Sequence, residues 1–425
     1  MKRIITVCMI VFLAVFAAGI VFGGAQQEKA AESKELSIYW NPDHLYDIYD
    51  EVINDYAEEK GLTVNKQVYH WGEFKTKLNS DMAAGTPPDL IEAPAYWFLE
   101  YGTQDLMADL TEEIDAWEES DDWFDATWKE CTLDGRKLGM KLHHTCFVLF
   151  YNQDHFDAAG VSKAPTNLTE MKQVIDKIYN ELGPDVMAFG FDPTGQYLVP
   201  FLASAETPSL IENNEIAIDT NTVRRTLKEL QDIANSGKVF IPEPGGEEAR
   251  TNVRLAFLTG KIAMMISGPW EIGNIKNNYP DLNYNVAMVP HLQGVDARTY
   301  TAGTGIGIPA DATQPVDVVW PLMQNLTSVE VEVTATLNNG MLMPRETWLN
   351  DPRIQDEKVV QLFKPLLPKA VPFDVDIRKL GLPEISWGGS VFKKLYETMI
   401  YSESDMDAAL DAYIKEANRL IKGKL

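Results

Sequence analysis

The spacing of apolar and polar positions predicts a first unit in which strands and helices alternate. Gly61 and Gly85 suit the ends of its two helices, because glycine readily adopts the left-handed conformation that closes a helix. A β-α-β-α-β order predicts a parallel sheet with helices on both faces. In chain order, the predicted elements are a strand at 36–39, a helix at 46–60, a strand at 63–69, a helix at 74–84 and a strand at 89–92.

The carboxyl ends of these three strands carry aromatic and hydrogen-bonding side chains. The carboxyl ends of parallel strands meet at one edge of a sheet, and in open α/β sheets ligands bind there. Any one of these residues could belong to the core or to a turn, but their recurrence at the same structural position favours a ligand-binding rim. They are Trp40, Asn41, His70, Trp71, Glu92, Tyr96 and Trp97.

A second α/β unit is predicted from residue 147 onward. Within it, the stretch FLTGKIAMMISGPWEI (257–272) predicts the end of a helix, a buried strand and a break at Gly268-Pro269. Trp270 then follows the carboxyl end of that strand, just before a helical stretch that begins at Glu271, so ligand contact and core packing both stay open for it. The other predicted elements are strands at 147–151, 261–266 and 284–289, a strand-rich region at 299–312, and helices at 170–181 (Asn167 as N-cap, with Glu170 as its capping partner), 247–258 and 405–424.

The N-terminus has the pattern of an export signal. Lys2 and Arg3 precede an apolar run that ends in small residues, which predicts a signal peptide over 1–25 cleaved near Ala25. An uncleaved membrane anchor is the alternative, because the run is long. A lipoprotein is disfavoured, since Cys8 lies inside the apolar run. Residues 26–35 are polar and suit a flexible tether, and we expect a periplasmic or otherwise extracytoplasmic protein.

Length, charge and cysteines narrow the class of protein. The 425 residues exceed one ordinary domain, and the net charge of -26 disfavours nucleic acid and anionic membranes as partners. Cys131 and Cys146 flank a predicted turn at Asp134-Gly135 and could form a disulfide in an oxidising compartment. Two thiols without a CxxC motif make a structural zinc site improbable.

Motifs of catalysis are mostly missing from the sequence. HExxH, GxSxG and GxxxxGK[ST] do not occur, and the glycines at 303, 305 and 307 fail the dinucleotide pattern at Ile308. His143 and His144 are adjacent, and neighbouring residues on a strand point to opposite faces, which disfavours a shared metal ion. We therefore expect no catalytic residues, no metal and no cofactor. Ten tryptophans and an aromatic rim favour a ligand with flat apolar faces and polar edges, such as a sugar.

Five motifs in order resemble those of the extracellular solute-binding proteins of ABC importers, in the maltose-binding-protein-like family 1 that mostly carries sugars. They are AAGTPPDLIEA (83–93), DGRKLGMKLHHTCFVLFYNQDHFDAAGV (134–161), FLTGKIAMMISGPWEI (257–272), AGTGIGIP (302–309) and DMDAALDAYIKEANRLI (405–421). The chain departs from the family at residues 139–143, where a usual Gly-Leu-Pro is replaced by Gly-Met-Lys-Leu-His. A histidine there could serve a sugar hydroxyl or, if protonated, a negatively charged substituent.

The resemblance implies a two-lobe α/β fold of the periplasmic-binding-protein type, type II-like, with a ligand cleft between the lobes and hinge crossings. It assigns 36–141 and 298–344 to lobe one, and 142–297 and 345–425 to lobe two. Trp387 is expected to open a late helix, with core packing as the alternative to ligand contact. The ligand-binding residues implied are Trp40, Asn41, Trp71, Glu92, Tyr96, His143, His144, Trp270, Gly303, Thr304 and Trp387.

The function implied is a monomeric receptor that binds a carbohydrate and delivers it to the membrane permease of an ABC importer. Three alternatives stay open: a binding protein for a glycerol phosphodiester, polyamine or metal complex, a secreted glycan-active enzyme, and a sensor that presents its closed form to a membrane kinase or chemoreceptor. Ligand turnover would distinguish the enzyme from the receptors.

Overall fold

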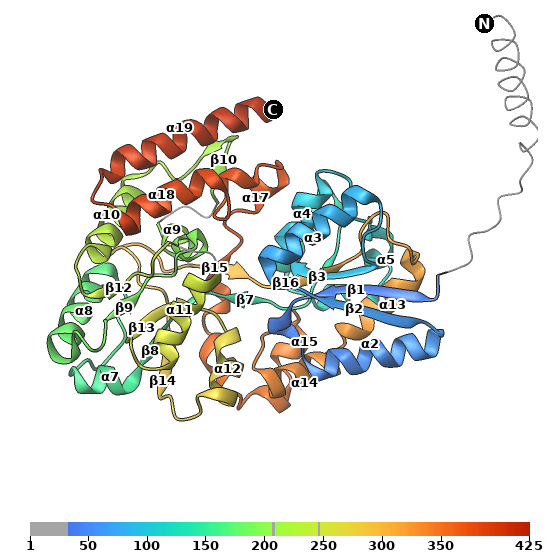
Figure 1. Ribbon diagram of the computed structural model, residues 1–425, viewed down its shortest axis with the longest axis horizontal. Helices are drawn as coiled ribbons and strands as arrows, with labels where there is room; N and C mark the ends of the chain where they lie inside the picture. The colour runs from blue at the N-terminus through green and yellow to red at the C-terminus, as the bar shows by residue number, and fades with distance from the viewer. Residues whose placement is uncertain (1–32, 206–208, 245–246) are drawn as a thin grey trace, which may run out of the picture.

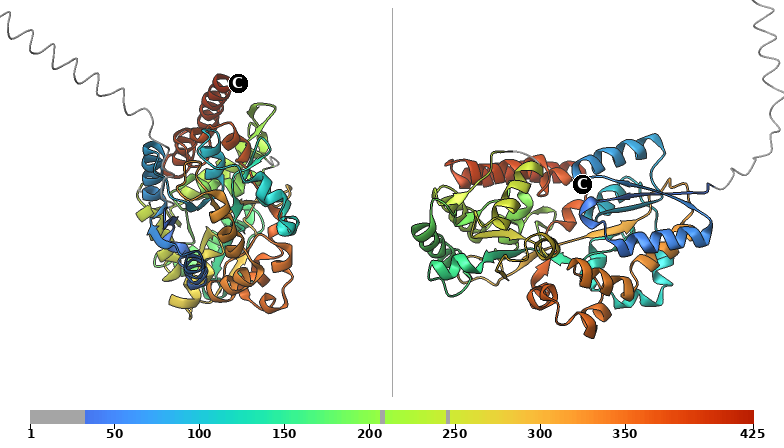
Figure 2. Two further views of the ribbon diagram at one scale, coloured as in Figure 1. Left: turned by 90° about the vertical axis from the view of Figure 1, so that its right-hand side faces the viewer. Right: turned by 60° about the horizontal axis from the view of Figure 1, so that its bottom comes forward.

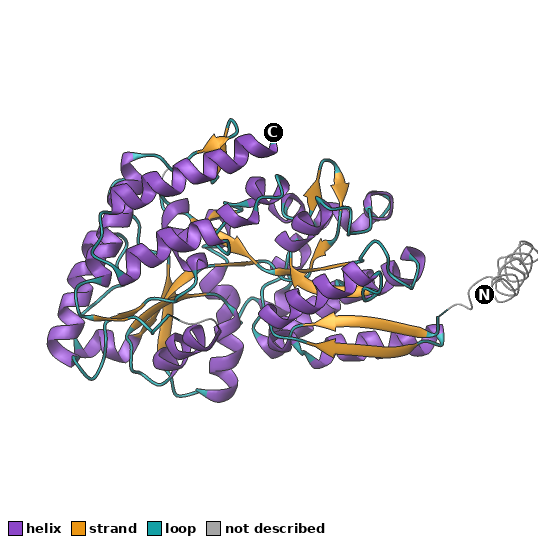
Figure 3. Cartoon of the chain, turned by 45° about the horizontal axis from the view of Figure 1, so that its top comes forward, coloured by secondary structure: helices purple, strands orange, loops and turns teal. Residues whose placement is uncertain are grey.

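Figure 1 shows two α/β lobes side by side, with strands β7 and β15 between them. The computed structural model describes residues 33–205, 209–244 and 247–425. The expected signal peptide (1–25) and most of the expected tether (26–32) lie outside the described residues. Each lobe is built around a five-stranded sheet, and helices cover both sheets (Figure 3), so the predicted two-lobe α/β architecture is confirmed.

The first lobe holds the predicted parallel unit. Its strands have the spatial order β2-β1-β3-β16-β6, in which β1 runs parallel to both of its neighbours while β16 runs antiparallel to β3 and β6. The five strands are β1 (Glu35–Trp40), β2 (Thr63–Val68), β3 (Leu90–Pro94), β6 (Met140–Lys141) and β16 (Thr304–Gly307). The helices along these chain segments are α2 (Asp47–Lys60), α3 (Trp71–Ala84), α4 (Tyr96–Gly102), α5 (Thr111–Asp115), α6 (Asp125–Lys129) and α13 (Val316–Leu326).

Helix α3 begins three residues before its predicted start. The N–H of Phe74 donates to the carbonyl of His70 at 2.8 Å, so His70 is the N-cap and Trp71 is the first helical residue. The apolar pattern predicts a start at Phe74, because Phe74 is the first residue of this helix whose side chain is buried. Gly85 closes the helix in the left-handed conformation, as expected.

The second lobe has the strand order β12-β9-β13-β8-β14, in which β8 runs antiparallel to both of its neighbours. The predicted strand at 261–266 begins later, at Met264, because the N–H groups of Lys261 and Ile262 are still bonded to Ala256 at the end of α11. The strands are β8 (Val148–Asn152), β9 (Phe189–Gly190), β12 (Val239–Phe240), β13 (Met264–Ser267) and β14 (Tyr284–Ala287).

Helices of the second lobe surround this sheet, and the C-terminal helix α19, the red helix that ends at C in Figure 2, packs on α10 and α18. Asn167 caps α8 as predicted, since its side chain accepts from the N–H of Glu170 at 2.9 Å. The Glu170 carboxylate, however, accepts from Thr166 and not from the N-cap residue. The helices are α7 (Gln153–Ala158), α8 (Leu168–Leu182), α9 (Val199–Ala203), α10 (Asn221–Ala234), α11 (Glu247–Leu258), α12 (Trp270–Asn278), α18 (Ser390–Tyr401) and α19 (Met406–Lys424).

A three-stranded sheet, ordered β17-β15-β7, lies where the chain crosses between the lobes. The chain leaves the first lobe through β7 (Thr145–Cys146) and returns through β15 (Thr299–Ala302), while β17 (Ala370–Val371) pairs with β15. Helix α14 (Val329–Asn339) contacts both α2 and α12. The exact boundaries of the lobes stay a prediction. The remaining elements are α15 (Glu346–Leu349), α16 (Lys358–Phe363), α17 (Val375–Lys379), β4 (Thr132–Leu133), β5 (Arg136–Lys137), β10 (Ile211–Glu212) and β11 (Glu215–Ile216).

Cys131 and Cys146 are both free and buried, so the possible disulfide is not formed. Burial raises the pKa of the Cys146 thiol to about 12, which keeps it protonated at neutral pH. In the part of the chain that is described, no helix combines the length and apolar character needed to cross a membrane.

Candidate functional site

A cavity of about 250 Å³ lies between the lobes, and both lobes and the crossing segments line it. The first-lobe wall consists of Asp43, His44, Trp71, Pro94, Tyr96 and Trp97. The crossing segments and their neighbours contribute Glu130, His143, Thr145, Tyr300, Thr301, Ala302, Gly303, Thr304 and Met341. The second-lobe wall consists of Thr194, Gln196, Arg250, Trp270 and Trp387.

The structure brings seven of the eleven candidate residues to this cavity and places the other four behind its wall. Those that line it are Trp71, Tyr96, His143, Trp270, Gly303, Thr304 and Trp387. Those behind the wall, all buried, are Trp40, Asn41, Glu92 and His144. That any of the eleven touches a ligand stays a prediction.

The first-lobe wall is supported by a network of hydrogen bonds at the ends of β1 and β3. The indole N–H of Trp40, 1% exposed, donates to the carbonyl of His44 at 2.7 Å. Asn41 caps the short helix η1 (Pro42–His44) by accepting from the N–H of Asp43 at 2.9 Å. Glu92 accepts from the Asn41 N–H at 3.2 Å and pairs with Nδ1 of His44 at 2.9 Å. These three buried candidates therefore hold His44 in place.

His143 and His144 lie between β6 and β7, outside any strand, so the alternation expected for a strand does not apply to them, but their side chains make separate contacts. His143 faces the cavity and is bonded through Nδ1 to Thr304 and through Nε2 to Tyr49, each at 2.9 Å. Burial lowers the pKa of His143 well below its ordinary value, so this imidazole is neutral. His144 packs its ring against Phe124, with 5.5 Å between the ring centroids.

His44, Glu92 and His143 are the group of described residues that could hold a metal ion, with ligand atoms within 4.8 Å of one another. Both nitrogens of His143 and Nδ1 of His44 already have hydrogen-bond partners. The arrangement is therefore that of a hydrogen-bonded network, and a metal ion would have to displace these bonds.

Gly303 allows the two crossing segments to approach closely. Its φ of +130° is rarely adopted by other residues, and a Cβ atom there would lie 2.0 Å from the carbonyl oxygen of His143. The backbone of the return crossing at Gly303 is thus in direct contact with the backbone of the outgoing crossing at His143, beside the cavity.

On the second-lobe wall, Trp270 is the first residue of α12, so this helix begins one residue earlier than the predicted start at Glu271. Its ring packs edge to face on Phe147 at 5.5 Å and covers Gly268, where a Cβ atom would meet the indole at 2.2 Å. The first turn of α12 is fixed by Glu271, which is fully buried and accepts from Ser267 at 2.9 Å and from Arg254 at 2.7 Å. Trp270 is thereby held at the cavity, partly buried.

Trp387 does not open a helix as expected; it lies in a turn with Gly388, and Gly389 follows as the N-cap of α18. It meets Tyr96 of the first lobe edge to face at 5.5 Å, and its indole N–H donates to the Tyr300 hydroxyl at 3.2 Å. The Arg378 guanidinium lies 4.0 Å from the centre of the Tyr96 ring. Arg378 also pairs with Asp374 at 2.9 Å and with Glu100 of α4, so charge and aromatic contacts join the two walls here.

A buried ion pair lies under the crossing segments. Lys141, with no exposed surface, pairs with Glu130 at 2.6 Å and donates to the carbonyl of Ala302 at 3.0 Å. The other oxygen of Glu130 accepts from the Thr301 hydroxyl. Since each charge has its partner and further hydrogen bonds, the pair can persist away from water.

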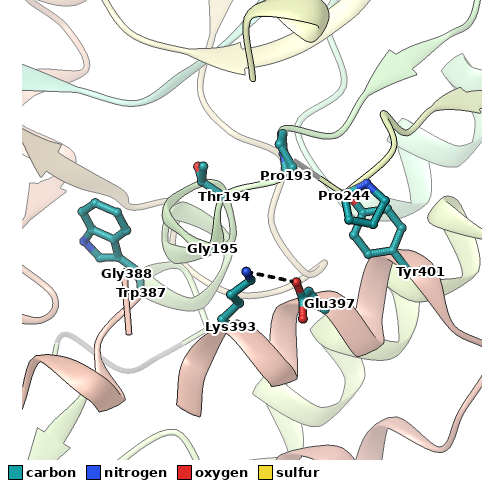
Figure 4. A pocket seen from close by; sticks show the side chains of 9 residues that line it. All are labelled: Pro193, Thr194, Gly195, Pro244, Trp387, Gly388, Lys393, Glu397 and Tyr401. Carbon is teal, nitrogen blue, oxygen red and sulfur yellow. Dashed lines mark ion pairs between the residues drawn. The ribbon is translucent and has the colours of Figure 1, made fainter. Parts of the chain in front are cut away.

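A second cavity, of about 420 Å³, adjoins the first and shares Thr194 and Trp387 with it. Figure 4 shows Trp387 and Thr194 on one side of this cavity and Tyr401 and Pro244 on the other. Lys393 and Glu397 of α18 form an ion pair of 3.5 Å along it. The two cavities offer room for a ligand longer than a single ring.

Several cavity residues were missed by the sequence analysis, among them His44, Arg250 and Tyr300. His44 had a usable signal, since it follows the strand end Trp40-Asn41 by three residues. Arg250 and Tyr300 had none, because they come from a helix and a crossing strand whose positions depend on how the lobes pack.

Comparisons with known proteins agree with this geometry. The model of the bacterial extracellular solute-binding protein family matches residues 42–333. A binding protein of Brucella abortus (strain 2308) is 27% identical over 296 residues, which cover 67% of this chain and 69% of that protein. The arabinooligosaccharide-binding protein of Halalkalibacterium halodurans is 23% identical over 274 residues, covering 61% of this chain and 59% of that protein.

Among solved structures, the GacH receptor of Streptomyces glaucescens GLA.O superposes with a TM-score of 0.80 at 19% identity, covering 92% of this chain and 99% of that one. This likeness confirms the two-lobe binding-protein fold. The matched family is one of extracellular binding proteins, which agrees with the expected extracytoplasmic location. The chain belongs to the bacterial extracellular solute-binding proteins.

Proposed function

We propose that this protein is the substrate-binding component of an ABC importer and carries a carbohydrate in the cavity between its lobes. The observation that carries the proposal is the composition of that cavity, in which Trp71, Tyr96, Trp270 and Trp387 stand among hydroxyl, imidazole and guanidinium groups. Sugars present apolar C–H faces to rings and polar edges to hydrogen-bonding groups, so this set of side chains suits them. Among the similar proteins, one is named for arabinooligosaccharides and another was solved with acarbose.

The second cavity supports an oligosaccharide over a monosaccharide. Trp387 borders both cavities, so a ring stacked near it would direct the next ring toward Lys393 and Tyr401. The proposed sequence of events is binding, closure of the lobes about the crossing segments, and docking of the closed form on membrane permease subunits. The protein is proposed to act as a monomer, exported by a signal peptide cleaved near Ala25 and free in the periplasm.

The charges at the cavity favour a neutral ligand over a polyamine, a metal complex or a phosphodiester. Glu130 is neutralised by Lys141, Glu92 is paired with His44, and Arg250 lies 3.8 Å from Asp192. Because each of these charges has an opposite charge beside it, they do not form a cluster that would attract a cation or an anion. A binding protein also has no chemistry of its own, and the proposal excludes turnover of the sugar.

A thermal-shift screen over monosaccharides and oligosaccharides tests the proposal, since a ligand that binds only the native state raises its melting temperature. We expect a rise with at least one sugar, a matching change in tryptophan fluorescence, and unchanged sugar after prolonged incubation. Cleaved product would support the glycan-active enzyme. A rise with a polyamine or glycerol phosphodiester, and none with any sugar, would contradict the carbohydrate assignment.

A further inference from the structure

The imidazole of His44 is fixed at the cavity by a buried carboxylate. Glu92 has no exposed surface, and its charge is met by Nδ1 of His44 at 2.9 Å and by the backbone N–H of Asn41 at 3.2 Å. The Nδ1 atom must carry a hydrogen to make the first of these bonds. Its orientation therefore leaves the second ring nitrogen, Nε2, as the one available to a ligand.

The groups around His44 decide whether its ring carries a charge. Glu92 faces it from β3, and Asp43 adjoins it in its own short helix, so two carboxylates favour the charged ring. Trp71 of α3 and Tyr46 lie beside it without charge, each with its ring centroid 6.1 Å away. His143, at 4.7 Å, is neutral, and the ammonium of Lys141 is paired with Glu130.

Burial opposes a charge on His44, but the carboxylate of Glu92 outweighs it, and the pKa of His44 is raised above its ordinary value. The physical reason is that a buried carboxylate without a cation beside it is far costlier than a buried ion pair. Among the described residues, Nε2 of His44 has no hydrogen-bond partner within the protein, and His44 lines the cavity.

We propose that His44, protonated on both nitrogens and held by Glu92, is a specificity-determining donor that selects a hydrogen-bond-accepting oxygen of the ligand, so that the receptor binds more tightly in acid than in base. The inference rests on the proposed function for the nature of the ligand, a sugar. A sugar hydroxyl both donates and accepts, so the oxygen selected is a ring or glycosidic oxygen, which only accepts. Loss of the proton from Nε2 turns that atom from a donor into an acceptor and then leaves two acceptors facing each other.

The charge of His44 is tested first without any ligand, by nuclear magnetic resonance of the full chain with labelled histidine. Six histidines give a tractable spectrum, and His44→Gln assigns the resonance. We expect His44 to be doubly protonated at about pH 6.5 and His143 to be neutral, which makes His143 an internal control. In Glu92→Gln, the titration of His44 should move to lower pH. A His44 that is neutral at about pH 6 would overturn the inference.

Ligand recognition is tested with the sugar that gives the largest rise in melting temperature, by calorimetric titration from about pH 5.5 to pH 9.5. The Kd should increase about 10-fold or more as pH rises through the pKa of His44, and His44→Gln should bind weakly at every pH without that slope. Titrations in two buffers of different ionisation enthalpy should report proton uptake on binding in basic solution, which a merely structural role of His44 would not produce.

A Kd that is independent of pH in the native protein would contradict the inference and leave the proposed function intact. Conversely, if no sugar raises the melting temperature, the proposed function fails, while the resonance of His44 still decides its charge. The two ideas can thus be rejected separately.

Discussion

Trp40 is the last residue of β1 and Trp270 comes three residues after β13, so both stand at the carboxyl end of a strand, yet the structure uses them differently. Trp40 is 1% exposed and its indole N–H is bonded to the carbonyl of His44, so it supports the wall from behind. Trp270 is the first residue of α12, is partly buried, and faces the cavity with its ring on Phe147. The same sequence signal, a tryptophan after a strand, thus marks a supporting residue in one lobe and a candidate ligand contact in the other.

The difference extends to the two walls. The first-lobe wall is held by hydrogen bonds among buried groups, in which Asn41, Glu92 and His44 depend on one another. The second-lobe wall is held by ring packing and by the anchored first turn of α12. Substitutions in the first wall should therefore lower the free energy of unfolding, and those in the second should mainly weaken binding.

The largest effect is expected for Trp40→Ala. Removal of a fully buried indole leaves a cavity and takes away one of the two hydrogen bonds that the His44 carbonyl accepts, the other coming from the N–H of Tyr46. It should lower the free energy of unfolding by about 3–5 kcal/mol. Denaturant unfolding followed by circular dichroism measures the loss. If Trp40→Ala were as stable as the native protein but bound sugar poorly, Trp40 would be a ligand contact after all.

Trp270→Ala should weaken ligand binding more than it lowers the free energy of unfolding. We expect the Kd for the bound sugar to rise about 30-fold, or about 2 kcal/mol, because a stacking surface is removed from the cavity. The free energy of unfolding should fall by only about 1–2 kcal/mol, since the side chain is partly exposed. Trp128→Ala is the matched control, because Trp128 is also partly buried but does not line the cavity. A collapsed apo Trp270→Ala protein would show that Trp270 is a core residue.

Glu92→Gln should change how stability depends on pH. The pKa of His44 is raised in the folded protein, so the pair with Glu92 contributes stability that is fully present below the ordinary histidine pKa and lost as pH rises through the folded value. At about pH 6 the free energy of unfolding of the variant should be lower than that of the native protein by about 1.5 kcal/mol. In base the difference should be smaller. Unfolding curves at both pH values measure the difference. An equal loss at both would mean that His44 is not charged in the folded state.

The smallest effect is expected for Lys393→Met, which tests the second cavity. Lys393 is exposed and its pair with Glu397 is weak, so stability should change by less than about 0.5 kcal/mol. Affinity for a long oligosaccharide should fall about 2- to 3-fold while affinity for its shortest binding fragment stays the same. Unchanged affinity for both ligands would place the ligand entirely in the first cavity, which Lys393 does not line.

Much of the fold was predictable from local patterns, and much of the site was not. The parallel unit β1-α2-β2-α3-β3 follows from the spacing of apolar residues and from the glycines that end its helices. Both signals depend only on residues that are close together along the chain. Gly303 became a candidate through the resemblance of its motif, AGTGIGIP (302–309). Whether Trp40 or Trp270 faces the cavity depends on two contacts that the pattern does not predict. Trp40 is bonded to His44 at the end of the short helix η1, and Trp270 packs on Phe147, which is distant along the chain. The resemblance supplied the candidate residues, but it did not separate those at the cavity from those behind it.

The position of β16 in the first sheet has a consequence for the order in which the protein folds. β16 (Thr304–Gly307) lies between β3 and β6, and β6 touches the sheet only through it. A chain that has emerged from the ribosome as far as residue 290 thus has every other strand of that sheet but cannot close it. Pairings over such a sequence separation form slowly, because a long loop must be closed first. We expect the nascent chain to remain incompletely folded until the return crossing is made, so that folding of the first lobe waits for the synthesis of the second.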